Sequence, residues 1–137
     1  MIVKQFKTGR EAKEYLLCLK EMFDKENEGK FESFETRGVE YGYILNEAAK
    51  QISDFSSVDF VALIEKEVSL EQFSIFLEAN KEKLKGGTIK FKLSDASNKK
   101  IDQLTLYLSN LLNIRVYRAF TVKLLLKYSF MSRTNQL

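Results

Sequence analysis

The residue pattern of positions 114–130 constrains the fold of this chain more than any other feature. The segment reads IRVYRAFTVKLLLKYSF, and apolar side chains fall at almost every second position. The apolar even-numbered set is Ile114, Val116, Phe120, Val122, Leu124, Leu126, Tyr128 and Phe130. A period of two is typical of a β-strand with one buried face. One strand of this length would span about 56 Å, so we expect a turn near 118–121 and two strands.

Three further strands are predicted. The segments 1–6 and 88–93 alternate between apolar and polar residues, and 58–64 is a short, nearly continuous apolar run. Apolar residues recur at helical spacing in four other segments. The helices are expected at about 9–26, 39–52 and 70–84, and from a cap at Asp95 or Ser97 to Asn113.

These elements predict the fold class. From residue 58 onward the order is strand, helix, strand, helix, strand, a βαβαβ run that suits right-handed crossovers. We therefore expect an α/β or α+β fold, a single-domain sandwich of about four helices packed on a mixed sheet of four to six strands. The length of 137 residues fits one domain, 1–137, and no internal repeat is evident.

Charge divides the chain into two halves. Residues 1–80, the acidic and mostly helical half, hold 10 basic against 16 acidic residues. Residues 81–137, the basic βαβ half, hold 12 basic against 3 acidic residues. Such a division indicates a polyanionic partner for the basic half.

The residue types that are absent argue against catalysis. The chain has no histidine and one cysteine, Cys18, so zinc sites of the Cys/His type and internal disulfides are excluded. The glycines form no phosphate-binding motif. We expect a non-enzymatic protein without metal or cofactor. No apolar run reaches the roughly 18 residues of a membrane span, so a cytoplasmic location without membrane contact is expected.

A basic sheet face is the first candidate site. Strand parity puts Lys90 and Lys92 on one side of their predicted strand. The odd-numbered side chains of 114–130 share one side of theirs. If the strands are neighbours, one face carries the candidate nucleic-acid or polyanion site, which consists of Lys90, Lys92, Arg115, Tyr117, Lys123 and Lys127. The alternative is an ordinary solvated face on which lysines serve solubility.

The second candidate site lies in the acidic half. Glu32 and Glu35 stand beside Phe31 and Phe34 in a polar, glycine-flanked loop. Aromatic side chains supply contact area and charges steer a partner, so these four residues are the candidate protein-binding site. The leading hypothesis is a small regulatory or adaptor protein that binds another protein. The alternative is a nucleic-acid-binding protein that uses the basic C-terminal face. The sequence leaves the oligomeric state open.

Residues 88–128 resemble a ribbon-helix-helix DNA-binding unit. The resemblance rests on the basic alternating strand TIKFKLSD and the helix NKKIDQLTLYLSNLLN. It implies a strand followed by two helices, and contact with DNA. The second helix of that family would fall on VYRAFTVKLLLKY, where the alternation predicts a strand instead.

Residues 54–117 resemble the second half of a STAS domain, a regulatory fold of sigma-factor antagonists. The matching segments are DFSSVDFVALI, KEKLKGG, TIKFKLSDAS and NIRVY. In that family a phosphorylatable Ser or Thr directly follows the central strand. Here EKEVS intervenes before the next helix, so the key motif is missing.

Overall fold

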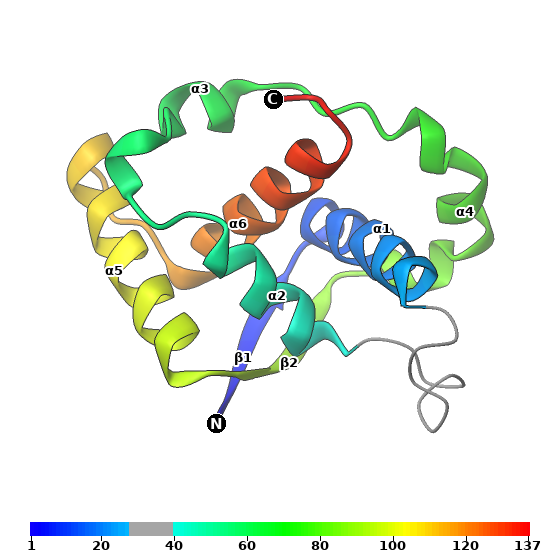
Figure 1. Cartoon of the computed structure of the whole chain (residues 1–137), viewed down its shortest axis with the longest axis horizontal. Coiled ribbons are helices and arrows are strands. Elements are labelled where there is room, and N and C mark those ends of the chain that lie inside the picture. Colours follow the sequence, from blue (N-terminus) through cyan, green and yellow to red (C-terminus); the bar gives the residue numbers. More distant parts are fainter. Residues whose placement is uncertain (28–39) are drawn as a thin grey trace.

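The computed structural model describes residues 1–27 and 40–137, in which two strands and a larger set of helices are found (Figure 1). The elements follow the chain as β1 (Ile2–Thr8), α1 (Arg10–Glu26), α2 (Tyr41–Lys50), η2 (Phe55–Ser57), α3 (Phe60–Glu65), η3 (Glu71–Phe73), α4 (Ser74–Ala79), η4 (Lys81–Leu84), β2 (Gly87–Leu93), α5 (Asp95–Leu112) and α6 (Arg118–Arg133). Elements marked η are short 3₁₀ helices. None of the described helices combines the length and the apolar character needed to cross a membrane.

The predicted sandwich with a four-to-six-stranded sheet is wrong. The described residues form a mostly helical α+β fold in which β1 and β2 make up a two-stranded sheet. The predicted βαβαβ order is wrong at two places, because helices α3 and α6 lie in the segments 58–64 and 114–130 that were predicted to be strands. At the first, Asp59 caps α3 by accepting a hydrogen bond from the backbone N–H of Ala62 at 3.1 Å.

The C-terminal segment holds the central helix, α6, instead of two strands. It contacts α1, α2, α3, α5 and β1, so most of its sides are covered by protein. The buried side chains of α6 are Thr121, Val122, Leu124, Leu125, Leu126, Lys127, Ser129, Phe130 and Met131. A helix that is apolar all round is typical of a buried position. The alternation in 114–130 therefore did not reflect one buried face.

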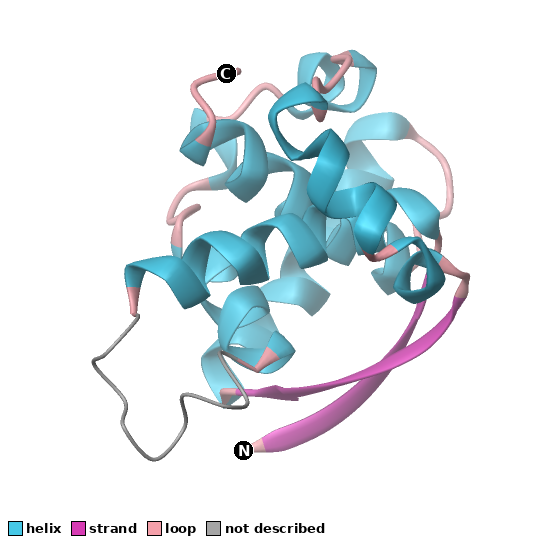
Figure 2. Cartoon of the chain, turned by 90° about the vertical axis from the view of Figure 1, so that its right-hand side faces the viewer, coloured by secondary structure: helices cyan, strands magenta, loops and turns pink. Residues whose placement is uncertain are grey.

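The two strands form an antiparallel ribbon on one side of the helices. The register runs from Ile2 opposite Leu93 to Thr8 opposite Gly87. The inner face buries Phe6 and Phe91, whose ring centroids lie 5.9 Å apart. Figure 2 shows the helices gathered on one side of the ribbon. The strands predicted from the alternation of 1–6 and 88–93 are confirmed.

The chain contains an internal structural repeat. Adding 85 to the bounds of β1, 2–8, gives those of β2, 87–93, and adding 85 to the first residue of α1 gives that of α5. Equivalent core positions are buried in both halves: Phe6 and Phe91, Leu16 and Ile101, Leu19 and Leu104, Phe23 and Leu108. The central pair of the ribbon is Gln5–Lys90, which the same shift maps onto itself. The repeat is one of element order and burial, whereas the residues at equivalent positions mostly differ, as at Leu16 and Ile101 or Phe23 and Leu108.

The packing of the helices follows the same approximate two-fold relation. Helix α2 packs against β2, and α6 packs against β1, so each half covers the strand of the other. Contacts between α1 and α6 correspond to those between α2 and α5, and α2 meets α6 at the centre. Residues 51–86, the connecting segment, run from α2 back to β2 around α6 and α1 (Figure 1).

The remaining predicted elements have mixed outcomes. Helices are confirmed at α1, α2 and α5, and Asn113 ends α5 in a left-handed conformation with φ of 55°. The helix predicted at 70–84 is broken into η3, α4 and η4. The strand, helix, helix order implied by the ribbon-helix-helix resemblance is present at 87–133 and again at 2–50. The STAS resemblance requires a strand where α3 lies.

Candidate nucleic-acid interface

The candidate site is the outward face of the ribbon, defined by six exposed side chains that point away from the helices. They are Val3, Gln5 and Lys7 of β1 and Thr88, Lys90 and Lys92 of β2. The register pairs Val3 with Lys92, Gln5 with Lys90, and Lys7 with Thr88. Directly opposite Cβ atoms in a ribbon lie about 5 Å apart. The six side chains therefore form one continuous strip.

The outward face carries positive charge that no carboxylate of the described residues pairs with. Both strands together contain four lysines and no Asp or Glu. Lys7, Lys90 and Lys92 form no ion pair with a carboxylate of the described residues. Ammonium groups that lack a protein partner attract the phosphates of nucleic acids, and their binding releases counterions.

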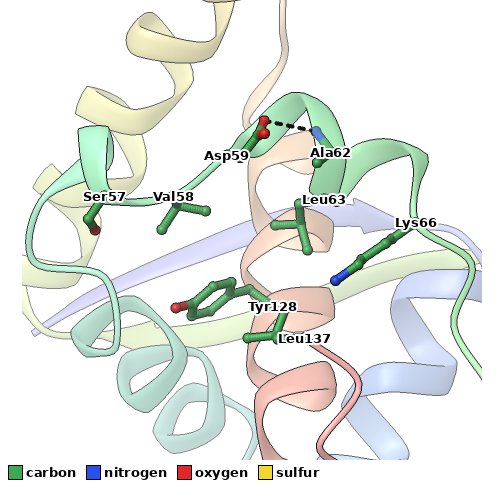
Figure 3. Close-up of a pocket in the computed structure, with 8 residues that line it drawn as sticks. All are labelled: Ser57, Val58, Asp59, Ala62, Leu63, Lys66, Tyr128 and Leu137. Atoms are coloured by element: carbon green, nitrogen blue, oxygen red, sulfur yellow. Dashed lines mark hydrogen bonds between the residues drawn. The ribbon is translucent and has the colours of Figure 1, made fainter.

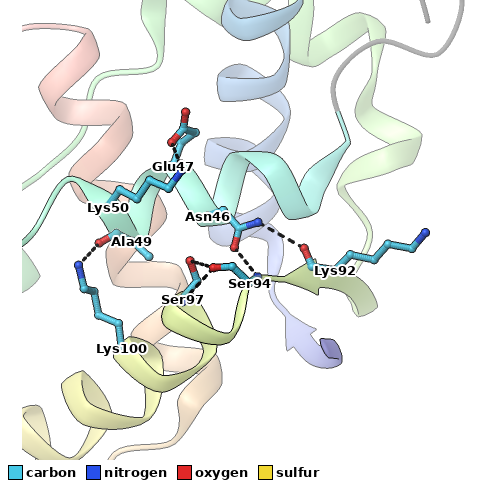
Figure 4. A network of polar contacts seen from close by, with 8 residues as sticks. All are labelled: Asn46, Glu47, Ala49, Lys50, Lys92, Ser94, Ser97 and Lys100. Atoms are coloured by element: carbon cyan, nitrogen blue, oxygen red, sulfur yellow. Dashed lines mark hydrogen bonds and ion pairs between the residues drawn. The ribbon is translucent and has the colours of Figure 1, made fainter. Parts of the chain in front are cut away.

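Helix α2 holds the C-terminal end of β2 by direct backbone contact. A Cβ atom at Gly42 would lie 2.3 Å from the carbonyl oxygen of Lys92, so the helix approaches the strand as closely as glycine permits. Asn46 accepts a hydrogen bond from the Ser94 N–H at 3.1 Å and donates to the Lys92 carbonyl at 3.5 Å. Figure 4 shows this network, with the Lys92 side chain extending away from α2.

Polar contacts also tie the other end of the ribbon. The hydroxyl of Thr8 donates to the carbonyl of Gly87 at 3.0 Å, and the Lys13 ammonium donates to the carbonyl of Lys85. At the first end, just after Leu93, Ser94 also caps α5, where its hydroxyl accepts from the Ser97 N–H at 3.1 Å. With both ends held and the inner face packed on the core, the outward side chains stand on a rigid support.

Four of the six residues predicted for the basic face lie away from the ribbon. Arg115 and Tyr117 are exposed in the linker between α5 and α6, where the guanidinium carbon lies 5.1 Å from the ring centroid. Lys123 lies on α6 and pairs with Glu11 at 3.9 Å. Lys127 is 5% exposed, and its ammonium donates to the carbonyl of Ile64 at 3.2 Å. The predicted shared sheet face is wrong because 114–130 is not a strand.

Two predicted residues, Lys90 and Lys92, do lie together on an exposed sheet face that no described helix covers. The sequence reasoning missed their neighbours on β1, namely Val3, Gln5 and Lys7. The signal was available, because MIVKQFK alternates as TIKFKL does. It was missed because nothing in the pattern shows that two segments 85 positions apart pair with each other.

The protein-binding candidates, Phe31, Phe34, Glu32 and Glu35, lie outside the described residues. That hypothesis therefore stays a prediction.

The described residues contain no cluster of three or more His, Cys, Asp or Glu side chains that could hold a metal ion. The thiol of Cys18 is fully buried, and burial, with smaller contributions from Glu14 and Glu21, raises its pKa to about 12. At neutral pH it is a protonated thiol in the core and a poor nucleophile.

A shallow pocket lies between α3 and the C-terminal part of α6 (Figure 3). It has a volume of about 240 Å³ and is lined by Ser57, Val58, Asp59, Ala62, Leu63, Lys66, Tyr128 and Leu137. Its one carboxylate, Asp59, caps α3. Its other polar side chains are those of Ser57, Lys66 and Tyr128.

Comparison of the chain with protein-family models, curated proteins and solved structures finds no match.

Proposed function

We propose that this chain binds double-stranded DNA by placing the outward face of its ribbon in the major groove. The observation that carries the proposal is an exposed, acid-free strip on a ribbon whose other face packs on helices. The major groove is about 12 Å wide and admits a two-stranded ribbon. The strands of such a ribbon lie about 4.8 Å apart, which leaves room for side chains on either side.

The six side chains divide into two roles by their chemistry. Lys7, Lys90 and Lys92 provide charge for phosphates and donors for guanine O6 and N7. Gln5 matches the donor and acceptor pattern of adenine, and the methyl groups of Val3 and Thr88 suit the methyl group of thymine. Contacts with phosphates give affinity, whereas contacts with base edges, among them those of Gln5 and Lys90, give sequence preference.

Duplex DNA is favoured over a single strand by what the outward face lacks. Proteins that bind single strands stack bases on aromatic side chains. The outward face has no aromatic residue, since Phe6 and Phe91 point into the core. The adaptor hypothesis depends on side chains at 31–35, and the described residues provide no observation that favours it over DNA binding.

Fluorescence anisotropy with a labelled, random-sequence duplex of about 20 base pairs, or two helical turns, tests the proposal. The test variant combines Lys7→Glu, Lys90→Glu and Lys92→Glu. The matched control combines Lys66→Glu, Lys81→Glu and Lys83→Glu, three exposed lysines of the connecting segment. Both variants change the net charge equally, so they separate a local site from general attraction.

We expect wild-type binding to weaken steeply with salt, and the ribbon variant to lower the slope of log affinity against log salt by about 3. The control variant should keep most of the wild-type slope. Absence of duplex binding at low salt, or equal losses in the two variants, would overturn the proposal.

A further inference from the structure

We infer that one copy of this chain reads a non-palindromic DNA site. The inference rests on the proposed function and adds to it the symmetry of the target. A symmetric protein matches a palindromic site, because its two-fold axis coincides with that of the DNA. Here the two-fold relation lies within one chain, between halves whose outward side chains differ.

The reading surface is complete in a single copy. Both strands of the ribbon come from one chain, and each is covered on its inner face by the second helix of the other half. No strand from a second copy is needed to form the outward face. One chain per duplex site therefore follows from the fold.

The outward positions related by the two-fold axis hold different residues. The shift of 85 positions relates Val3 to Thr88, Gln5 to Lys90, and Lys7 to Lys92. Lys7 and Lys92 are both lysines, so a lysine lies near each end of the ribbon. The first two pairs differ: Gln5 and Lys90 suit different base edges, whereas Val3 and Thr88 both offer a methyl group to thymine and only Thr88 adds a hydroxyl that can form hydrogen bonds.

The difference is greatest at the centre. Gln5 and Lys90 lie opposite each other on the two-fold axis, where a symmetric ribbon would present two identical side chains. Glutamine suits adenine, and lysine suits the O6 and N7 acceptors of guanine. The target therefore favours adenine on the Gln5 side and guanine on the Lys90 side.

Selection of bound sequences from a random duplex library, with the full chain, tests the inference. The stoichiometry on the selected duplex is measured by light scattering. A symmetrised variant, Val3→Thr with Gln5→Lys, gives both strands the same three outward residues. A second variant, Gln5→Lys with Lys90→Gln, exchanges the central pair. All substituted side chains are exposed, and circular dichroism checks that each variant folds.

The expected results are a non-palindromic consensus and one chain per duplex for the wild type. The symmetrised variant should select a palindromic sequence, and the exchange variant should reverse the central bases relative to their flanks, with about a tenfold preference or more for the reversed site. A palindromic wild-type consensus, two chains per site, or binding without sequence preference would overturn the inference and leave the proposed function standing. Absence of duplex binding would overturn both.

Discussion

At the scale of single residues, two residues of α2 decide where the ribbon lies. Gly42 permits contact between helix and strand backbones, and Asn46 bridges the last residues of β2 and the cap of α5. The corresponding junction of β1 and α1 is built differently. Thr8 and Glu11 have the spacing of a capping box, yet Gly9 is the N-cap, without a side-chain hydrogen bond, and Thr8 instead donates to Gly87.

The Gly42→Ala variant should lose stability although alanine is the better helix former. Its Cβ would meet the carbonyl oxygen and the amide nitrogen of Lys92 at 2.3 and 2.9 Å, and backbone atoms cannot rotate away. Overpacking of this kind costs about 1–3 kcal/mol, and a contact with backbone atoms that cannot move away belongs above the low end of that range, so the cost exceeds the gain in helix propensity of about 1 kcal/mol at most. Urea denaturation should therefore show a net loss of about 1–2 kcal/mol.

Gly9→Ala is the matched control, because a Cβ atom at this position would meet no atom within 4 Å apart from those of the adjoining residues in the chain. It should change the free energy of unfolding by less than about 1 kcal/mol. An equal loss in both variants would contradict the close-contact explanation.

At the scale of elements, α6 shows why the period of an apolar pattern can mislead. A helix on a protein surface has one apolar face, and its sequence repeats with a period of 3.6 residues. Helix α6 is surrounded by four other helices and β1, so burial acts on most of its positions. Its buried positions include the polar residue Thr121, whose hydroxyl oxygen lies 2.6 Å from that of Thr105 on α5. When residues on most sides of a helix are buried, the sequence shows no single apolar face with a period of 3.6 residues.

Lys127→Met should stabilise the protein at neutral pH. The Lys127 ammonium is buried, and this desolvation lowers its pKa; Glu11 opposes the shift and Lys123 adds to it. Methionine has similar length and avoids the cost of burying a charge, which a single hydrogen bond to Ile64 offsets only in part. Urea denaturation at pH 7 should show a gain of about 1 kcal/mol.

The pH dependence of that gain follows from linkage. Between the lowered pKa of the folded protein and the unfolded value of 10.5, the unfolded chain binds the extra proton. Wild-type stability from this group therefore rises with pH in that window, and the advantage of Lys127→Met should shrink as pH approaches 10.5. A constant difference across this range, or a loss of stability at pH 7, would contradict the prediction.

At the scale of the whole molecule, the two halves depend on each other. The second helix of each half covers the strand of the other, and α2 meets α6 at the centre. The connecting segment joins the halves through helices of six residues or fewer. It exposes Ile75 to 87% and adds few buried side chains, among them Phe60, Leu63, Leu77 and Leu84.

Amide hydrogen exchange should therefore divide the chain into two classes. Peptides from β1–α1 and from β2–α5 should exchange slowly and with similar free energies, because opening one half exposes the core of the other. Peptides from residues 53–83 should exchange faster, because short exposed helices open locally. Early exchange of β2–α5 while β1–α1 stays protected would show that the halves unfold separately.

The sequence by itself determined the elements whose burial is one-sided. Strands β1 and β2 and helices α2 and α5 each bury one face, so their apolar residues repeat with the period of the element. Helix α1 was predicted correctly as well, although all residues of 15–19 are buried. The same alternation turns Lys90 and Lys92 outward and places two of the candidate-site residues correctly on one face.

Tertiary structure alone decided the rest. Whether 114–130 forms a helix or strands depends on the elements that surround α6. At 58–64 the cap at Asp59 starts helix α3, although the short apolar run by itself predicts a strand. The pairing of β1 with β2 joins segments 85 positions apart, and no local pattern records a contact made at that distance. The ribbon, its internal two-fold relation and the contribution of Val3, Gln5 and Lys7 to its outward face exist only because that pairing forms.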